Sequence, residues 1–137
     1  MAHCCCGSLR AQTRGEPAAV GACFCEECQR RTGSIFGVSS YWRREMVELS
    51  GAAERYVRDA QEGYKVALYF CPKCGSTVYW EGDRGPGWLG IAAGAFFDPD
   101  FPAPTISVWE RSRPGWISLP TADHCPQNPP WPKRDRT

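Results

Sequence analysis

Eight of the nine cysteines of this chain stand in three short clusters, and one stands alone. Thiolates at such short spacings bind zinc or carry out redox chemistry. A disulfide framework needs an oxidising compartment, and the first seven residues lack the hydrophobic segment of a secretory signal. We therefore expect a cytoplasmic protein with reduced cysteines. In chain order these are Cys4, Cys5 and Cys6, then Cys23, Cys25 and Cys28, then Cys71 and Cys74, and finally Cys125.

Two of the clusters supply the pairs that a closed structural zinc site needs. Such a site takes four thiolates at about 2.3 Å in a tetrahedron, usually from two local pairs. Alternate side chains share a face in an extended segment, so Cys4 and Cys6 can bind one ion while Cys5 points away. The second pair is Cys71 and Cys74. We predict a structural zinc ion held by these two pairs, with redox chemistry at the second pair as the alternative.

The middle cluster offers three thiolates and no fourth ligand nearby in the sequence. Three protein ligands and one exchangeable position are typical of a reactive zinc site. We therefore predict a catalytic zinc ion bound by Cys23, Cys25 and Cys28. The alternative is a second structural site completed by one of the remaining donors, which are Cys5, Cys125, His3 and His124. We expect the two histidines to lie at the surface and Cys125 to be a free thiol.

Zinc bound by three thiolates is already net negative, so it activates water less than a site with three neutral histidines. A substrate thiol bound there as a thiolate would be deprotonated at neutral pH and still nucleophilic toward carbonyl groups. The charge therefore favours thiol transfer over hydrolysis. Three polar residues directly after the third ligand could balance the negative charge or bind a substrate carboxylate, unless they form a solvated basic turn. They are Gln29, Arg30 and Arg31.

The rest of the chain predicts a mainly β fold, because helical periodicity is scarce and 14 glycines and 12 prolines interrupt the sequence. We expect a single zinc-stabilised domain of short strands over residues 1–128 and a Pro-rich polar tail over residues 129–137. Lysine and arginine number 16 against 15 acidic residues, so the chain lacks the basic surplus typical of nucleic-acid binding. No apolar run approaches the ~20 residues of a membrane helix.

The clearest hairpin signal runs from Tyr64 to Glu81, where aromatic and aliphatic residues flank a zinc-knuckle turn that Gly75 closes. One short helix is expected from Gln29 to Thr32, ending at Gly33. Four tryptophans are expected in the core, namely Trp80, Trp88, Trp109 and Trp116. The other expected strands are Ser8 to Gln12, Ser39 to Trp42, Glu54 to Val57, Leu89 to Ala93 and Thr105 to Val108.

Four motifs follow one another between about residues 3 and 128. They are Cys4-x-Cys6-Gly7, Cys23-x-Cys25-x-x-Cys28-x-x-x-Thr32-Gly33, Phe70-Cys71-x-x-Cys74-Gly75 and Ser112-Arg113-Pro114-x-Trp116. In this order they resemble the glutathione-dependent formaldehyde-activating enzyme family, which includes centromere protein V. Phe24 stands where that family commonly has histidine.

The resemblance implies a tent-like β fold with two zinc ions, one structural and one catalytic, at the two sites derived above. It also implies a carbon-sulfur lyase that adds a small thiol to an aldehyde, forming S-(hydroxymethyl)glutathione from glutathione and formaldehyde. The alternative function is a non-enzymatic, zinc-stabilised protein-interaction module, for which the centromere protein is a precedent. A nucleic-acid zinc ribbon comes third, because the net charge is only +1.

Overall fold

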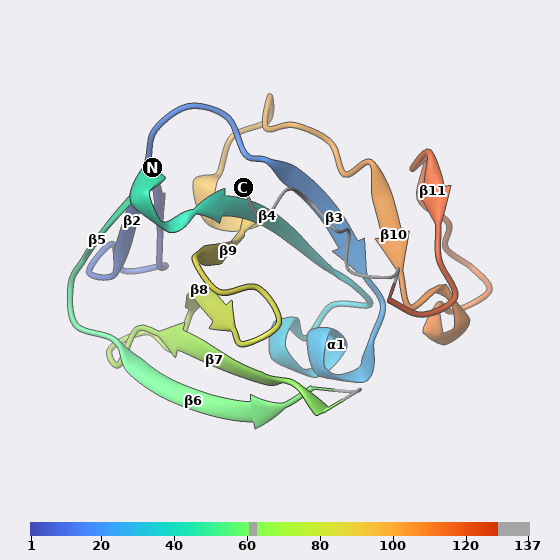
Figure 1. The fold of residues 1–137 in the computed structure, drawn as a ribbon, viewed down its shortest axis with the longest axis horizontal. Helices are drawn as coiled ribbons and strands as arrows, with labels where there is room; N and C mark the ends of the chain where they lie inside the picture. Colours follow the sequence, from blue (N-terminus) through green and yellow to red (C-terminus); the bar gives the residue numbers. More distant parts are fainter. Residues whose placement is uncertain (61–62, 129–137) are drawn as a thin grey trace. The chain divides into compact units, whose positions relative to one another are not determined.

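The computed structural model describes residues 1–60 and 63–128, and the chain falls into two compact units. The first comprises Met1–Val20 and Ser39–Pro102, and the second comprises Gly21–Val38 and Ala103–Thr137. The chain is mostly β, as the sequence predicts (Figure 1). The single domain over residues 1–128 stays a prediction, and the tail predicted for residues 129–137 lies outside the described residues.

The described strand pairs within the first unit are all antiparallel. Three of the strands form a small sheet in the order β1 (Ala2–His3), β2 (Arg10–Thr13) and β5 (Val47–Ser50). The others follow in the order β4 (Gly37–Arg43, which enters this unit at Ser39), β9 (Trp88–Ala92), β8 (Thr77–Gly82), β7 (Lys65–Phe70) and β6 (Glu54–Asp59). Two short 3-10 helices, η1 (Arg44–Met46) and η3 (Ala93–Phe96), complete the unit.

The core of the first unit encloses two of the predicted metal ligands. Leu9, Val78 and Ile91 are fully buried in it. Cys4 and Cys71, 2% and 0% exposed, belong to the same cluster of buried side chains. Because the core fixes these two cysteines, the positions of their sulfur atoms depend on the packing of the whole unit.

The predicted knuckle hairpin is confirmed. Strands β7 and β8 pair antiparallel, with Leu68 opposite Trp80, and the turn between them carries Cys71 and Cys74. The rings of Tyr69 and Tyr79 stack at a centroid distance of 4.8 Å across the same pair of strands. The hairpin therefore holds the second cysteine pair on a rigid, aromatic-lined support.

Replacing Gly90 by alanine is expected to destabilise the first unit by about 1–3 kcal/mol, the usual effect of overpacking a core. A Cβ at Gly90 would lie 2.0 Å from Nε1 of Trp80, the residue opposite it on β8. Urea denaturation measures the change. Gly94→Ala is the control, because a Cβ there meets no atom within 4 Å. Equal losses for the two variants would contradict the close packing of Trp80 on Gly90.

The second unit contains parallel strands and the longest described helix. Its strands follow in the order β3 (Ala19–Cys23), β10 (Ile106–Val108) and β11 (Asp123–His124). The helix α1 (Glu26–Thr32) follows β3, and the 3-10 helix η4 (Glu110–Ser112) follows β10. The core consists of Phe24, Cys25 and Trp109, with Ile35, Phe36 and Leu119 among the side chains packed against it.

Two expectations from the sequence change in the structure. The helix begins at Glu26 rather than Gln29, so it includes Cys28, and it ends before Gly33 as predicted, with Gly33 in the left-handed conformation (φ 69°). Trp109 is buried as expected, but Trp116 is 74% exposed, and its placement in the core is wrong. Within the described residues, no helix has the length and hydrophobicity needed to cross a membrane.

Candidate metal centres

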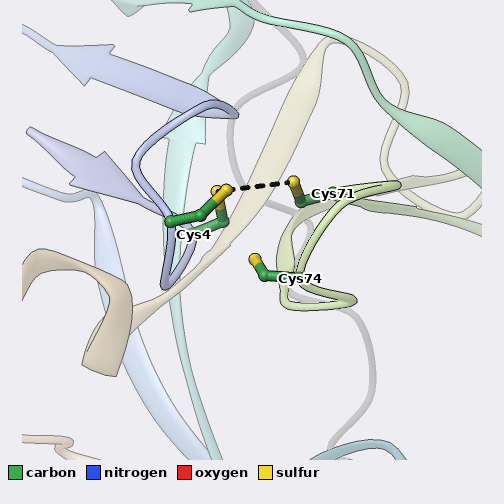
Figure 2. Close-up of side chains that lie close together, drawn as sticks. Cys4, Cys71 and Cys74 are labelled. Carbon is green, nitrogen blue, oxygen red and sulfur yellow. Dashed lines mark hydrogen bonds between the residues drawn. The ribbon is translucent and has the colours of Figure 1, made fainter.

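The four cysteines of the predicted structural site, called the first cluster from here on, have the geometry of a closed tetrahedral thiolate site. The Sγ atoms of Cys4, Cys6, Cys71 and Cys74 all lie within 4.8 Å of one another. The Sγ of Cys6 lies 3.6 Å from those of both Cys4 and Cys71. A tetrahedron with zinc–sulfur distances of about 2.3 Å requires sulfur–sulfur distances of about 3.8 Å. Figure 2 shows the sulfur atoms of Cys4, Cys71 and Cys74 turned toward one shared space. The donor set therefore fits zinc.

Two similar turns present these sulfur atoms. The backbone N–H of Leu9 donates to Sγ of Cys4 at 3.2 Å, and the N–H of Lys73 donates to Sγ of Cys71 at 3.4 Å. Such bonds stabilise the thiolate that a metal requires. The glycine after each pair has a positive φ, 80° at Gly7 and 78° at Gly75, a conformation that glycine adopts without strain. In each turn a backbone N–H thus donates to the first sulfur atom, and a glycine with a positive φ follows the second cysteine.

Two serines that the sequence reasoning missed complete these turns. The hydroxyl of Ser8 lies 3.3 Å from Sγ of Cys6, and that of Ser76 lies 3.4 Å from Sγ of Cys74. Hydrogen bonding to Ser8 lowers the pKa of Cys6, and hydrogen bonding to Ser76 lowers the pKa of Cys74 to about 5. A signal for both was present in the sequence, because the same tripeptide occurs twice, as Cys6-Gly7-Ser8 and Cys74-Gly75-Ser76.

The three cysteines of the predicted catalytic site, called the second cluster from here on, lie where β3 meets α1. The Sγ atoms of Cys23, Cys25 and Cys28 lie within 4.8 Å of one another, and no fourth histidine, cysteine or acidic side chain among the described residues joins them. Cys25 caps the helix, since its Sγ accepts a hydrogen bond from the N–H of Cys28 at 3.4 Å. The N–H of Cys25 donates to Sγ of Cys23, also at 3.4 Å. Three thiolates of a local turn therefore converge and leave a tetrahedral position without a described protein ligand.

Negative charge in this cluster collects on Cys28. Hydrogen bonds from the thiols of Cys23 and Cys25 are the main cause that lowers the pKa of Cys28 to about 3. The positive charge of Arg31 contributes to this shift, and burial opposes it. Hydrogen bonding to Cys25 and Cys28 raises the pKa of Cys23, and burial adds to that rise. A thiolate is therefore available at neutral pH beside a guanidinium group, which suits the capture of a divalent cation.

The four other donors considered from the sequence join neither cluster. Cys5 is exposed, Cys125 is half-buried, and neither belongs to a group of converging ligands. His3 is exposed, and its Nδ1 lies 2.7 Å from the carbonyl oxygen of Cys4. His124 is 47% exposed, and its Nδ1 lies 2.8 Å from Oε1 of Glu110. The completion of the second site by one of these donors is therefore not supported by their positions.

The three polar residues after Cys28 have different surroundings. The side-chain amide of Gln29 donates to the carbonyl oxygens of Phe24 at 2.9 Å and Ser112 at 3.4 Å. Arg30 is 79% exposed and forms an ion pair with Glu26 at 2.7 Å. Gln29, Arg30, Glu26 and Ser112 line a shallow cavity of about 260 Å³. The guanidinium of Arg31 lies instead over Gly37, where a Cβ would be 2.8 Å from its terminal nitrogen.

Gln29→Ala is expected to destabilise the second unit by about 1–2 kcal/mol, because the carbonyl oxygens of Phe24 and Ser112 lose their side-chain donor. Thermal unfolding measures this change. Arg30→Ala is the neighbouring control, and loss of its exposed ion pair should change stability by only about 0.5 kcal/mol or less. If Arg30→Ala were the more damaging substitution, the structural role of Gln29 would be contradicted.

The Ser-Arg-Pro motif supports the same region. Arg113 forms an ion pair with Glu110 at 2.6 Å and donates to the carbonyl oxygen of Ile117. The other carboxylate oxygen of Glu110 accepts a hydrogen bond from the Ser107 hydroxyl at 2.5 Å. These contacts hold η4 in place. The carbonyl oxygen of its last residue, Ser112, accepts a hydrogen bond from the Gln29 amide. Arg113 therefore has a structural role in holding the turn that accepts the Gln29 amide.

Comparison with known proteins agrees with this geometry. The family model described as glutathione-dependent formaldehyde-activating enzyme matches residues 1–112. A crystal structure of a Rhodobacter sphaeroides protein is similar, with a TM-score of 0.55 and 19% identity, over 69% of this chain and 84% of that chain. At that identity the likeness concerns the fold alone. No significant match is found among curated proteins. The match over most of its length shows that the chain belongs to the glutathione-dependent formaldehyde-activating enzyme family.

Proposed function

We propose that the chain is a zinc-dependent enzyme of the carbon-sulfur lyase type that joins a small thiol, glutathione or a similar compound, to formaldehyde or a related aldehyde. The observation that carries the proposal is the second cluster. Its three converging thiols have no fourth described protein ligand, which is the arrangement expected where a substrate completes the coordination of a metal.

The two clusters would then have separate roles. Cys4, Cys6, Cys71 and Cys74 would hold a structural zinc ion within the core of the first unit. Cys23, Cys25 and Cys28 would hold the catalytic ion. Zinc bound by these three thiolates supplies the means to keep a substrate thiol deprotonated at neutral pH. The closed site offers no comparable position, because four thiolates already satisfy a tetrahedral ion.

The residues around the second cluster suit a charged sulfur nucleophile. Phe24 is fully buried and packs with Cys25 and Trp109, so one side of the cluster is dry and apolar. Electrostatic attraction is strong in such surroundings. Arg31 is the nearby positive charge that also lowers the pKa of Cys28. We assign Arg31 the role of balancing the negative charge of the ligands and of the incoming thiolate.

The reaction balances without a redox partner. The substrate thiolate attacks the carbonyl carbon of the aldehyde and a carbon–sulfur bond forms. The carbon–oxygen π bond breaks, its electron pair moves to the oxygen, and that oxygen takes up the proton that the thiol released. Arg30 is the strongest candidate for a substrate carboxylate, because it is exposed and lines the cavity beside Gln29 and Ser112. The Gln29 amide is already engaged with two backbone carbonyls, so we assign it to positioning rather than to substrate binding.

The test is an exchange measurement with ¹³C-labelled formaldehyde and glutathione, followed by two-dimensional exchange NMR. The zinc-loaded protein is expected to speed interconversion of free formaldehyde and S-(hydroxymethyl)glutathione. Other low-molecular-weight thiols are run in parallel to identify the preferred one. Cys5→Ser is the matched control, since Cys5 is exposed and its Sγ joins neither group of converging sulfur atoms. Exchange at the uncatalysed rate with every thiol would exclude formaldehyde as the substrate of the zinc-loaded protein.

Cobalt substitution separates the enzyme from a non-enzymatic interaction module. In the proposed enzyme, an added thiol enters the coordination sphere of the metal at Cys23, Cys25 and Cys28 and changes its thiolate-to-cobalt absorption. A module with two fully protein-ligated ions would give absorption spectra that do not change when thiols are added. The measurement reads ligation directly, so it remains informative even if the physiological aldehyde is absent from the NMR panel.

A further inference from the structure

Strand β6 presents an open edge. Among the described residues it pairs only with β7, and it ends the sheet order in the first unit. Figure 1 shows it as the strand beyond β7. Its first four side chains are all exposed, whichever face they lie on, and they include Tyr56 at 59% and Val57 at 40%. An open edge with exposed apolar side chains is a template for pairing with another strand.

The charges of this strand restrict what can pair with it. Glu54-Arg55-Tyr56-Val57-Arg58-Asp59 begins and ends with an acidic residue, and each of these has an arginine next to it. Charged residues on an edge normally protect it from pairing. A partner that pairs with this edge must therefore place an acidic residue opposite at least one of these arginines, and a second copy of β6 running antiparallel offers Glu54 and Asp59 for this.

Symmetry limits the possible registers between two copies. A two-fold axis normal to the sheet places a given residue of both copies on the same face of the joined sheet. Residues that lie opposite each other across the two strands also share a face, so the two paired positions must lie on one face of β6. Residues on one face are an even number of positions apart. The register that would place Arg55 opposite Arg58 and Glu54 opposite Asp59 is therefore impossible. The two registers with the longest overlap set either Tyr56 or Val57 opposite its own copy.

The ion pairs already formed by the charged residues of β6 favour one of these two registers. The register centred on Val57 would require Asp59 to face Arg55, but Asp59 is already paired with Lys65 at 2.7 Å. The register centred on Tyr56 instead places Glu54 opposite Arg58 at both ends, and within the described residues neither of these forms an ion pair. It also sets the two Tyr56 rings together, and aromatic and opposite-charge cross-strand pairs both stabilise a sheet.

We propose that two copies of the chain associate through β6, antiparallel, with Tyr56 opposite Tyr56 and with Glu54 opposite Arg58. The two β6 strands then satisfy the backbone groups of each other's open edge and join the antiparallel strands of two first units into one continuous sheet. The association uses no residue of either cysteine cluster, so it is independent of the proposed function.

A concentration series of the zinc-loaded full chain in analytical ultracentrifugation tests the association. The wild type is expected to form dimers reversibly. Arg58→Glu turns two attractions into two repulsions and should weaken dimerisation about tenfold or more. The double swap Glu54→Arg with Arg58→Glu restores opposite charges and should restore the dimer. A wild type that stays monomeric, or a dimer that Arg58→Glu leaves unchanged, overturns the proposal.

Cross-linking tests the register. Residues opposite each other on antiparallel strands have Cα atoms about 4.5–5.5 Å apart, within the range that a disulfide spans. Tyr56→Cys should therefore form a covalent dimer on mild oxidation, seen on a non-reducing gel after the remaining thiols are blocked. Val57→Cys is the matched control, because each new cysteine faces Arg55 and not its own copy. Cross-linking through position 57 in preference to position 56 overturns the register.

Discussion

Cys71→Ser is expected to abolish cooperative folding of the first unit. The side chain is fully buried in the core and its Sγ contacts that of Cys6 at 3.6 Å. Loss of one ligand from a closed site leaves the metal weakly held, and structural zinc contributes about 10–16 kcal/mol of apparent binding energy. That contribution is comparable to the whole stability of a typical domain, about 5–15 kcal/mol. Circular dichroism and the zinc content of the purified protein measure the outcome.

Cys5→Ser is the control for this result. Cys5 stands between two ligands of the same cluster, yet it is exposed and contributes only its backbone N–H, which donates to the Ser76 hydroxyl. The substitution keeps that bond, so the melting temperature and zinc content should stay at the wild-type values. Normal folding of Cys71→Ser with full zinc content would contradict a structural site at this cluster.

The convergence of the cysteines into two groups could be predicted from the sequence because the cysteines are grouped locally. Cys23, Cys25 and Cys28 come from one turn, and the spacing itself brings their sulfur atoms together. The first site joins pairs that lie far apart in the chain. It was still predictable, because a closed tetrahedral site usually takes four thiolates from two local pairs, and the sequence contains two such pairs.

The missed strands are those whose pairing depends on distant residues. Strands β1 and β11 contain two residues each and β5 contains four. Strand β3 has the sequence Ala-Val-Gly-Ala-Cys, with little β-branched or aromatic content. Such segments carry weak strand signals of their own. β3 is a strand because β10 pairs with it in parallel, placing Val108 beside Cys23. Tertiary contacts, not local propensity, decide these elements.

The contacts of the polar residues near the second cluster could not be predicted from the sequence either. The sequence identifies Gln29 as a possible substrate contact, but its amide is held by the carbonyl oxygens of Phe24 and Ser112. The second of these lies on η4, a turn that begins after Trp109 adopts a positive φ of 56°. Every residue has a backbone carbonyl oxygen, so the residue types do not indicate which carbonyls accept this amide. The contact could only be found in the structure.

Cys25→Ser is expected to remove catalysis while leaving the chain folded. Cys25 is the N-cap of α1, with extended backbone angles, and its Sγ accepts the N–H of Cys28. Serine is among the best N-cap residues, so its hydroxyl can keep this hydrogen bond. It is a poor zinc ligand compared with a thiolate. The helix should therefore persist after the metal is lost.

The expected readings are one zinc ion per chain in place of two, exchange of formaldehyde with the thiol slowed at least about a hundredfold, and a melting transition of the first unit that stays close to the wild type. Cys125→Ser, at a half-buried cysteine outside both clusters, should retain both ions and full activity. If Cys25→Ser unfolded the chain as completely as Cys71→Ser, the second cluster would be a structural site as well. Because serine preserves the helix cap, such unfolding would have to come from the lost metal, and this makes the pair of variants a direct test of the division between a structural and a catalytic ion.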